Sequence, residues 1–80
     1  MEELIKEILS HKNEDGVIGE LANELYNIIE DHKAGHITDE DLKELLTETI
    51  NAFKAHENAN NEVMIRWAVK IAQLAAKAMI

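Results

Sequence analysis

The chain has 80 residues, of which 16 are acidic and 8 basic, with a net charge of −8 and no cysteine. This composition excludes disulfides and thiolate metal sites, and it argues against direct binding to nucleic acid, which requires a basic surface. The length predicts a single domain over residues 1–80, and so small a domain is marginally stable unless it packs efficiently or binds a second chain.

The charge is unevenly distributed along the chain. Residues 1–60 contain 15 acids and 5 bases, a balance of −10, whereas residues 61–80 contain one acid and three bases, a balance of +2. The most apolar stretch carries Arg66, Lys70 and Lys77, so we expect no membrane span. The start of the chain lacks the pattern of a secretion signal, and together with the absence of cysteine this favours a cytoplasmic location.

Residues 1–11 and 17–33 form the first two predicted helices. Asp15-Gly16 is a strong turn signal between them. Each helix has apolar side chains at helical spacing on one face. These residues are Met1, Leu4, Ile5, Ile8 and Leu9 in the first helix, and Ile18, Leu21, Ala22, Leu25, Ile28 and Ile29 in the second.

The connection to the third predicted helix, residues 39–57, is specified by its capping residues. Gly35 suits the left-handed position that ends a helix, and Thr38 suits the N-cap of the next one. The acids at 39–41 favour the positive end of the helix dipole. We therefore expect a sharp reversal of the chain here.

The fourth predicted helix, residues 61–80, is apolar over most of its circumference, and Asn60 is its expected N-cap. Its polar side chains form one narrow stripe at spacings of four, four, three and four residues. A helix of this kind must be covered by its own chain or by another chain. We predict an all-α fold, a small antiparallel four-helix bundle with a short first helix and this apolar C-terminal helix in the middle. The stripe consists of Glu62, Arg66, Lys70, Gln73 and Lys77.

Two interpretations of this last helix remain open. It could be an ordinary member of a four-helix core, or one apolar flank could be left uncovered and bind a second chain. The first helix has only about three turns to cover it, which favours the second interpretation. The candidate flank is Ile65, Val69, Ala72, Ala76, Met79 and Ile80.

Metal sites have little support in the sequence. Gly35-His36-Ile37-Thr38 followed by Asp41 resembles the second half of an EF-hand loop, but His32 and Ala34 stand where that loop needs oxygen ligands. The pair His32 and His36 is interrupted by the helix-ending glycine. We expect the histidines at helix C-terminal ends to interact with the helix dipole instead, and we expect no metal or cofactor.

Catalysis has no better support. Ser10 and His11 are neighbours on one helix, so their side chains point about 100° apart and cannot act as nucleophile and base. The three glycines are isolated and form no phosphate-binding loop. We therefore expect neither enzymatic activity nor a small-molecule substrate.

The segment from His32 to Leu46, HKAGHITDEDLKELL, is similar to the helical hairpin of many small acidic proteins encoded by bacteriophages. The resemblance covers about a quarter of the chain, and its capping pattern is common. It implies a small accessory or virion protein that acts by binding another protein. It assigns no catalytic or binding role to any residue.

Together these observations predict a non-enzymatic protein–protein interaction module that self-associates through the apolar flank. The alternative is an acidic inhibitor that mimics nucleic acid and occupies the basic groove of a nucleic-acid-binding protein. The two differ in their expected sensitivity to salt. The candidate acidic surface is Glu24, Glu30, Asp31, Asp39, Glu40, Asp41, Glu44 and Glu48.

Overall fold

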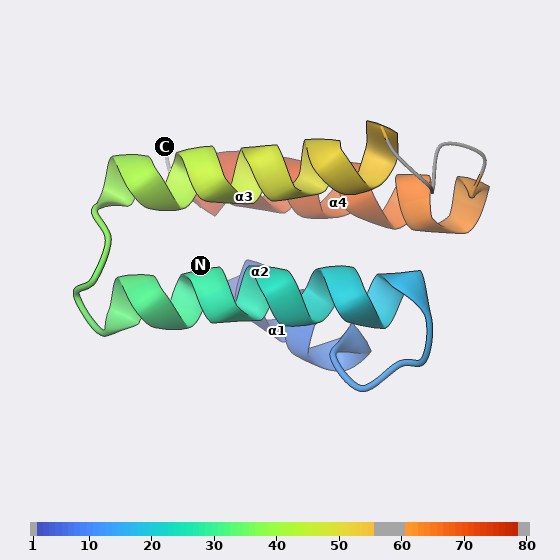
Figure 1. Cartoon of the computed structure of the whole chain (residues 1–80), viewed down its shortest axis with the longest axis horizontal. Coiled ribbons are helices and arrows are strands. Elements are labelled where there is room, and N and C mark those ends of the chain that lie inside the picture. The colour runs from blue at the N-terminus through green and yellow to red at the C-terminus, as the bar shows by residue number, and fades with distance from the viewer. Residues whose placement is uncertain (1, 56–60, 79–80) are drawn as a thin grey trace.

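The computed structural model describes residues 2–55 and 61–78, and four helices account for most of them (Figure 1). They are α1 (Glu2–His11), α2 (Val17–Lys33), α3 (Asp39–Ala55) and α4 (Glu62–Ala78). No strand is present in the described residues. The predicted all-α class and the four predicted helices are confirmed.

Successive helices run antiparallel and enclose one core, as expected for a four-helix bundle. In Figure 1, α2 and α3 form the near layer, with α1 behind α2 and α4 behind α3. Helix α1 packs against α2 and α4, and α3 likewise packs against α2 and α4. Helix α4 contacts all three other helices, as does α2, but one side of α4 faces solvent.

Most of the core comes from the apolar faces of the helices, but Leu9, predicted on the face of the first helix, is 48% exposed because it points about 100° away from the buried Ile8. Helices α1, α2 and α3 contribute two, four and three residues, and α4 contributes five. Within residues 2–55 and 61–78 no polar or charged side chain is buried. Full burial of a leucine or isoleucine contributes about 1.5–3 kcal/mol, so this cluster is the main source of stability. Its members are Leu4, Ile8, Leu21, Ala22, Leu25, Ile29, Leu42, Leu46, Ile50, Met64, Trp67, Ala68, Ile71 and Ala75.

The connection between α2 and α3 has the predicted geometry. Gly35 adopts a φ of 80°, in the left-handed region that favours glycine. Thr38 is the N-cap of α3, because its Oγ1 accepts a hydrogen bond from the Asp41 N–H at 3.1 Å. Asp41 Oδ2 accepts one from the Thr38 N–H at 3.4 Å, which completes a reciprocal capping box.

The turn between α1 and α2 contains a constraint that the sequence did not reveal. Gly19 is buried in the first turn of α2, and a Cβ at this position would lie 1.8 Å from the carbonyl oxygen of Glu14. Only glycine allows the preceding turn to cross α2 so closely. Its low helix propensity is therefore secondary to its lack of a side chain.

The start of α4 differs from the prediction by one residue. Asn61 caps the helix, since its Oδ1 accepts a hydrogen bond from the Met64 N–H at 3.0 Å. The predicted cap, Asn60, lies outside the described residues, as do the predicted last two residues of α3 and the flank residues Met79 and Ile80.

Candidate functional site

Four residues of the predicted flank form a continuous row along α4, which we call the apolar stripe: Ile65, Val69, Ala72 and Ala76. Their spacing of four, three and four residues keeps them on one side of the helix. Val69 is 39% exposed, Ala72 and Ala76 are exposed, and Ile65 is half-buried against the core. The stripe is therefore a surface feature, although it borders the core.

A groove runs beside the stripe, between α3 and α4. Its α4 wall is built of small side chains, which leave room for another helix to approach closely. The groove encloses about 100 Å³. It is lined by Ala72, Ala75 and Ala76 from α4 and by Lys43, Thr47, Ile50 and Asn51 from α3.

Sequence reasoning missed the α3 side of this groove. Lys43, Thr47 and Asn51 follow one another at intervals of four residues, so they form a row on α3. That row could have been read from the sequence. Its position next to α4 depends on how the two helices pack, which periodicity alone does not specify.

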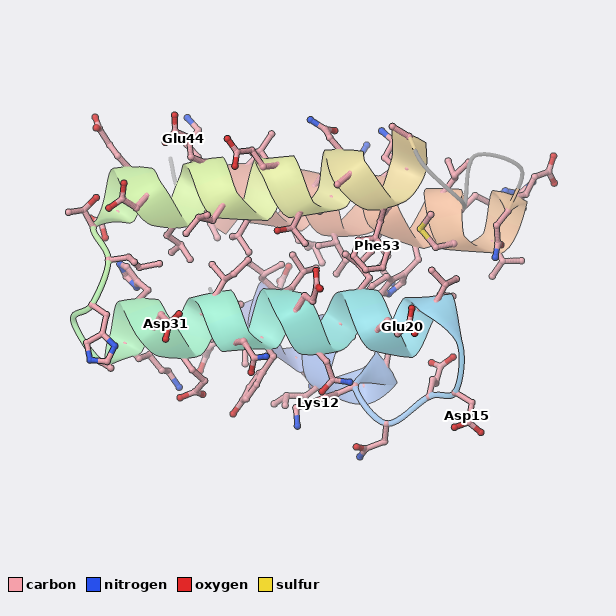
Figure 2. The ribbon with its side chains drawn as sticks, viewed as in Figure 1. Lys12, Asp15, Glu20, Asp31, Glu44 and Phe53 are labelled. Atoms are coloured by element: carbon pink, nitrogen blue, oxygen red, sulfur yellow. The ribbon has the colours of Figure 1, made fainter. Side chains whose placement is uncertain are left out.

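The two edges that flank the stripe and its groove carry opposite charge. The basic edge on α4 consists of Glu62, Arg66, Lys70 and Lys77, and its one acid and three bases give a formal +2; Lys70 also pairs with Glu7 of α1, so Arg66 and Lys77 are its unshared bases in the described ion pairs. The acidic edge on α3 consists of Glu40, Lys43, Glu44 and Glu48, and its three acids and one base give −2. All eight residues are exposed. Figure 2 shows Glu44 on the side of α3 that points away from α2.

The opposite side of α4 is closed by α1. Oε1 of Glu7 accepts a hydrogen bond from the Trp67 Nε1–H at 3.0 Å and lies 3.3 Å from the Lys70 Nζ. His11 Nε2 lies 3.3 Å from the same oxygen, His11 Nδ1 pairs with Glu14, and the His11 ring meets the Trp67 ring edge-on at 5.0 Å. We call this cluster the Trp67 junction.

The Trp67 junction stabilises the ionised form of Glu7. Partial burial alone would raise the pKa of Glu7, but the hydrogen bonds from Trp67 and Lys70 and the positive charges of Lys70 and His11 outweigh it. The pKa of Glu7 is therefore lower than its ordinary value of 4.5. This anchors α1 on α4 and leaves the stripe on the uncovered side.

Several residues of the alternative acidic surface have partners within the chain. Asp39 Oδ1 lies 2.6 Å from His32 Nε2, and Asp31 Oδ1 lies 3.9 Å from His36 Nδ1. His11 and His32 both lie in the last turn of a helix, as predicted. The other two predicted residues with local partners are Asp41, in the capping box, and Glu30.

Glu30 is half-buried and accepts a hydrogen bond from the Tyr26 hydroxyl, which together with its negative charge raises the pKa of Tyr26. The acidic residues of α3 that remain exposed in a row are Glu40, Glu44 and Glu48, at intervals of four residues. The structure thus separates the predicted acidic surface into residues with local partners around the α2–α3 connection, an exposed row on α3, and Glu24, which is exposed on α2.

Among the described residues no group of three or more histidine, aspartate or glutamate side chains could hold a metal ion. The Ser10 hydroxyl donates a hydrogen bond to the Lys6 carbonyl oxygen at 2.9 Å. His56 lies outside the described residues.

None of the described helices is long and apolar enough to cross a membrane. No protein-family model, curated protein or solved structure matches the chain.

Proposed function

We propose that this protein is a non-enzymatic interaction module that self-associates through the apolar stripe of α4. One observation carries the proposal: Val69, Ala72 and Ala76 are exposed in a row on the most apolar helix, whereas the other exposed large apolar side chains, Leu9, Leu45 and Val63, lie on three different helices. The partner is a second copy of the same chain, because a flank of valine and alanine fits an identical flank without leaving a polar group unpaired.

Close helix packing would supply most of the binding energy. Alanines at positions 72 and 76 allow two backbones to approach, and Val69 and Ile65 provide the larger apolar contacts. The groove formed with Thr47 and Asn51 offers space for the partner's side chains. Association also adds buried apolar area to a chain whose size limits its own core.

Size measurement in solution tests this proposal. We expect a dimer by sedimentation equilibrium, and Ala72→Glu should convert it to a monomer because it places a carboxylate within the contact. Asn27→Glu is the matched control: it adds the same charge at an exposed position on α2, which lines neither the stripe nor its groove, and should leave the dimer intact. Circular dichroism should show equal helix content in both variants.

A strictly monomeric wild-type chain at high protein concentration would contradict the proposal. So would a dimer that Ala72→Glu leaves unchanged, because the contact would then lie elsewhere.

The exposed row of Glu40, Glu44 and Glu48 favours a second candidate function, an acidic nucleic-acid mimic that inhibits a basic protein. Such a complex would form mainly through charge, so its affinity should fall steeply as ionic strength rises. Capture of a purified nucleic-acid-binding protein that persists unchanged at high salt would contradict the mimic.

For location, we propose the cytoplasm, or the virion for a phage-encoded chain. The absence of cysteine supports a reducing compartment. Fractionation of cells that express a tagged chain tests this location, and recovery from the secreted fraction would contradict it.

A further inference from the structure

We infer that two copies of this chain pair with their α4 helices parallel, related by a two-fold axis that runs along the helices. The inference rests on the proposed self-association and adds the orientation of the partner. It follows from the opposite charges of the two edges that flank the apolar stripe.

A two-fold axis can bring two apolar stripes face to face in two ways. If the α4 helices run antiparallel, the axis crosses them at a right angle, and each edge of the stripe meets the same edge of the partner. If they run parallel, the axis lies along them, and each edge meets the opposite edge of the partner. The charges of the edges therefore discriminate between the two arrangements.

The antiparallel arrangement places like charges together. The basic edge, with Arg66 and Lys77, would face its own copy, and the acidic edge, with Glu44 and Glu48, would face its own copy. The parallel arrangement places the +2 edge of each copy opposite the −2 edge of the other. Complementary charge at the rim of a contact selects orientation and excludes the alternative.

The heights of the charged residues along the bundle agree with the parallel arrangement. Lys43 and Thr47 of α3 line the same groove as Ala75 and Ala76 of α4, so these segments lie at one level. Glu44 therefore lies at the level of Lys77. A two-fold axis along the helices preserves this level, and it places Lys77 of one copy opposite Glu44 of the partner subunit.

Single-cysteine variants test the orientation directly, because the natural chain contains no cysteine. In the parallel dimer every stripe position faces its own copy, so Val69→Cys and Ala76→Cys should each form a disulfide-linked dimer under mild oxidation. In an antiparallel dimer a position meets its own copy only near the two-fold axis.

Positions 69 and 76 are separated by about 10 Å along the helix, at about 1.5 Å per residue. A disulfide requires Cα atoms within about 7 Å. An antiparallel dimer can therefore cross-link at most one of these two positions, wherever its axis lies. Ser10→Cys, exposed on α1, is the control for random collision and should remain uncrosslinked.

Charge reversal gives a second test, because the two arrangements predict opposite changes in dimer affinity for Lys77→Glu. In the parallel dimer, Lys77→Glu and Glu44→Lys should each weaken dimerisation by roughly fivefold to tenfold, and the double variant should recover most of the loss. In an antiparallel dimer, Lys77→Glu relieves repulsion and should strengthen it. Lys77 also lines a shallow hollow with Glu2 and Glu3 of its own chain, so Lys77→Glu alone could act within one copy. Recovery of affinity in the double variant shows that the effect depends on Glu44 of the partner subunit.

The outcomes separate the orientation from the proposed function. Cross-linking at both positions 69 and 76, with recovery in the double charge variant, supports the parallel dimer. A wild-type dimer that cross-links at only one of the two positions, or at neither, overturns the orientation and leaves self-association standing. A wild-type monomer overturns both.

Discussion

At the scale of single residues, Trp67 is the side chain on which the seam between α1 and α4 depends. It is 7% exposed, and its indole N–H donates to Glu7 across 60 residues of sequence. The ring also packs edge-on against His11. The first helix has only ten residues and buries only Leu4 and Ile8, so this contact adds to a small apolar interface.

Trp67→Phe should therefore destabilise the fold. The variant keeps an aromatic ring but removes the donor to an ionised carboxylate, and hydrogen bonds to charged groups contribute about 1.5–3 kcal/mol. Urea unfolding followed by circular dichroism measures the loss. The same substitution in a Glu7→Gln background should cost less, because the two residues share one interaction. Equal costs in both backgrounds would contradict this coupling.

The lowered pKa of Glu7 predicts a pH dependence of stability. A carboxyl group whose pKa is lower in the folded chain stabilises the fold above its unfolded-state pKa, and this contribution disappears as pH falls through the folded-state value. Wild type should thus be more stable than Glu7→Gln at pH 7, and the difference should shrink as the pH falls below the ordinary value of 4.5. Urea unfolding at pH 7 and pH 3 measures it. A difference of the same size at both pH values would contradict the prediction.

At the scale of elements, the turn between α1 and α2 depends on the close approach at Gly19. Gly→Ala inside a helix normally stabilises by about 0.5–1 kcal/mol. Here the added methyl would collide with the Glu14 carbonyl, so the turn must move. The steric clash lowers the stability of the fold, whereas the better helix propensity of alanine raises it. The sign of the measured change therefore shows which of the two effects is larger at this position.

Gly19→Ala should lower the free energy of unfolding by about 1–3 kcal/mol, the usual cost of overpacking. Thermal unfolding measures it. Glu20→Ala, at the next residue and exposed, is the control and should change stability by less than about 0.5 kcal/mol. A Gly19→Ala variant that is more stable than wild type would contradict the prediction, because the turn at Glu14 would then move away without a loss of stability.

The elements also show what sequence could and could not predict. Helix existence and the α2–α3 reversal were predictable, because apolar periodicity, Gly35 and Thr38 act locally. The cap of α4 was misplaced by one residue because Asn60 and Asn61 offer the same side chain. The role of Gly19 was missed because it depends on where a distant carbonyl passes.

In the candidate site, too, the features that depend on local sequence were predictable and those that depend on helix packing were not. The stripe could be predicted from the spacing of apolar residues on α4. Its groove partners Thr47 and Asn51 could not, because they belong to α3 and meet α4 only after the bundle forms. Likewise, the sequence grouped Asp31 and Asp39 with the free acids, whereas the geometry of the α2–α3 connection pairs them with histidines.

At the scale of the whole molecule, charge and apolar surface are segregated. The acids lie mainly on α1, α2 and α3, whereas α4 carries three bases and the stripe. Two copies with a net charge of −8 each repel at long range. A dimer is therefore favoured only if its contact lies where the local charge is balanced, which is the case for opposed α3 and α4 edges.

This segregation links folding to association and predicts that thermal stability depends on protein concentration. When a dimer unfolds to two separate chains, a tenfold rise in concentration adds about 1.4 kcal/mol to the stability of the folded dimer. For a unit of twice 80 residues this raises the unfolding midpoint by about 3–5 °C. Scanning calorimetry across a hundredfold concentration range measures the shift.

The Ala72→Glu variant is the control for this concentration-dependent shift in the unfolding midpoint. A monomer unfolds at a midpoint that does not depend on concentration, so the variant should show a constant midpoint that wild type approaches on dilution. Convergence of the two proteins at low concentration would show that the α4 contact, and not damage to the bundle, accounts for the difference. A variant that stays less stable at every dilution would instead place Ala72 within the fold's own packing, and the stripe would then be part of the monomer.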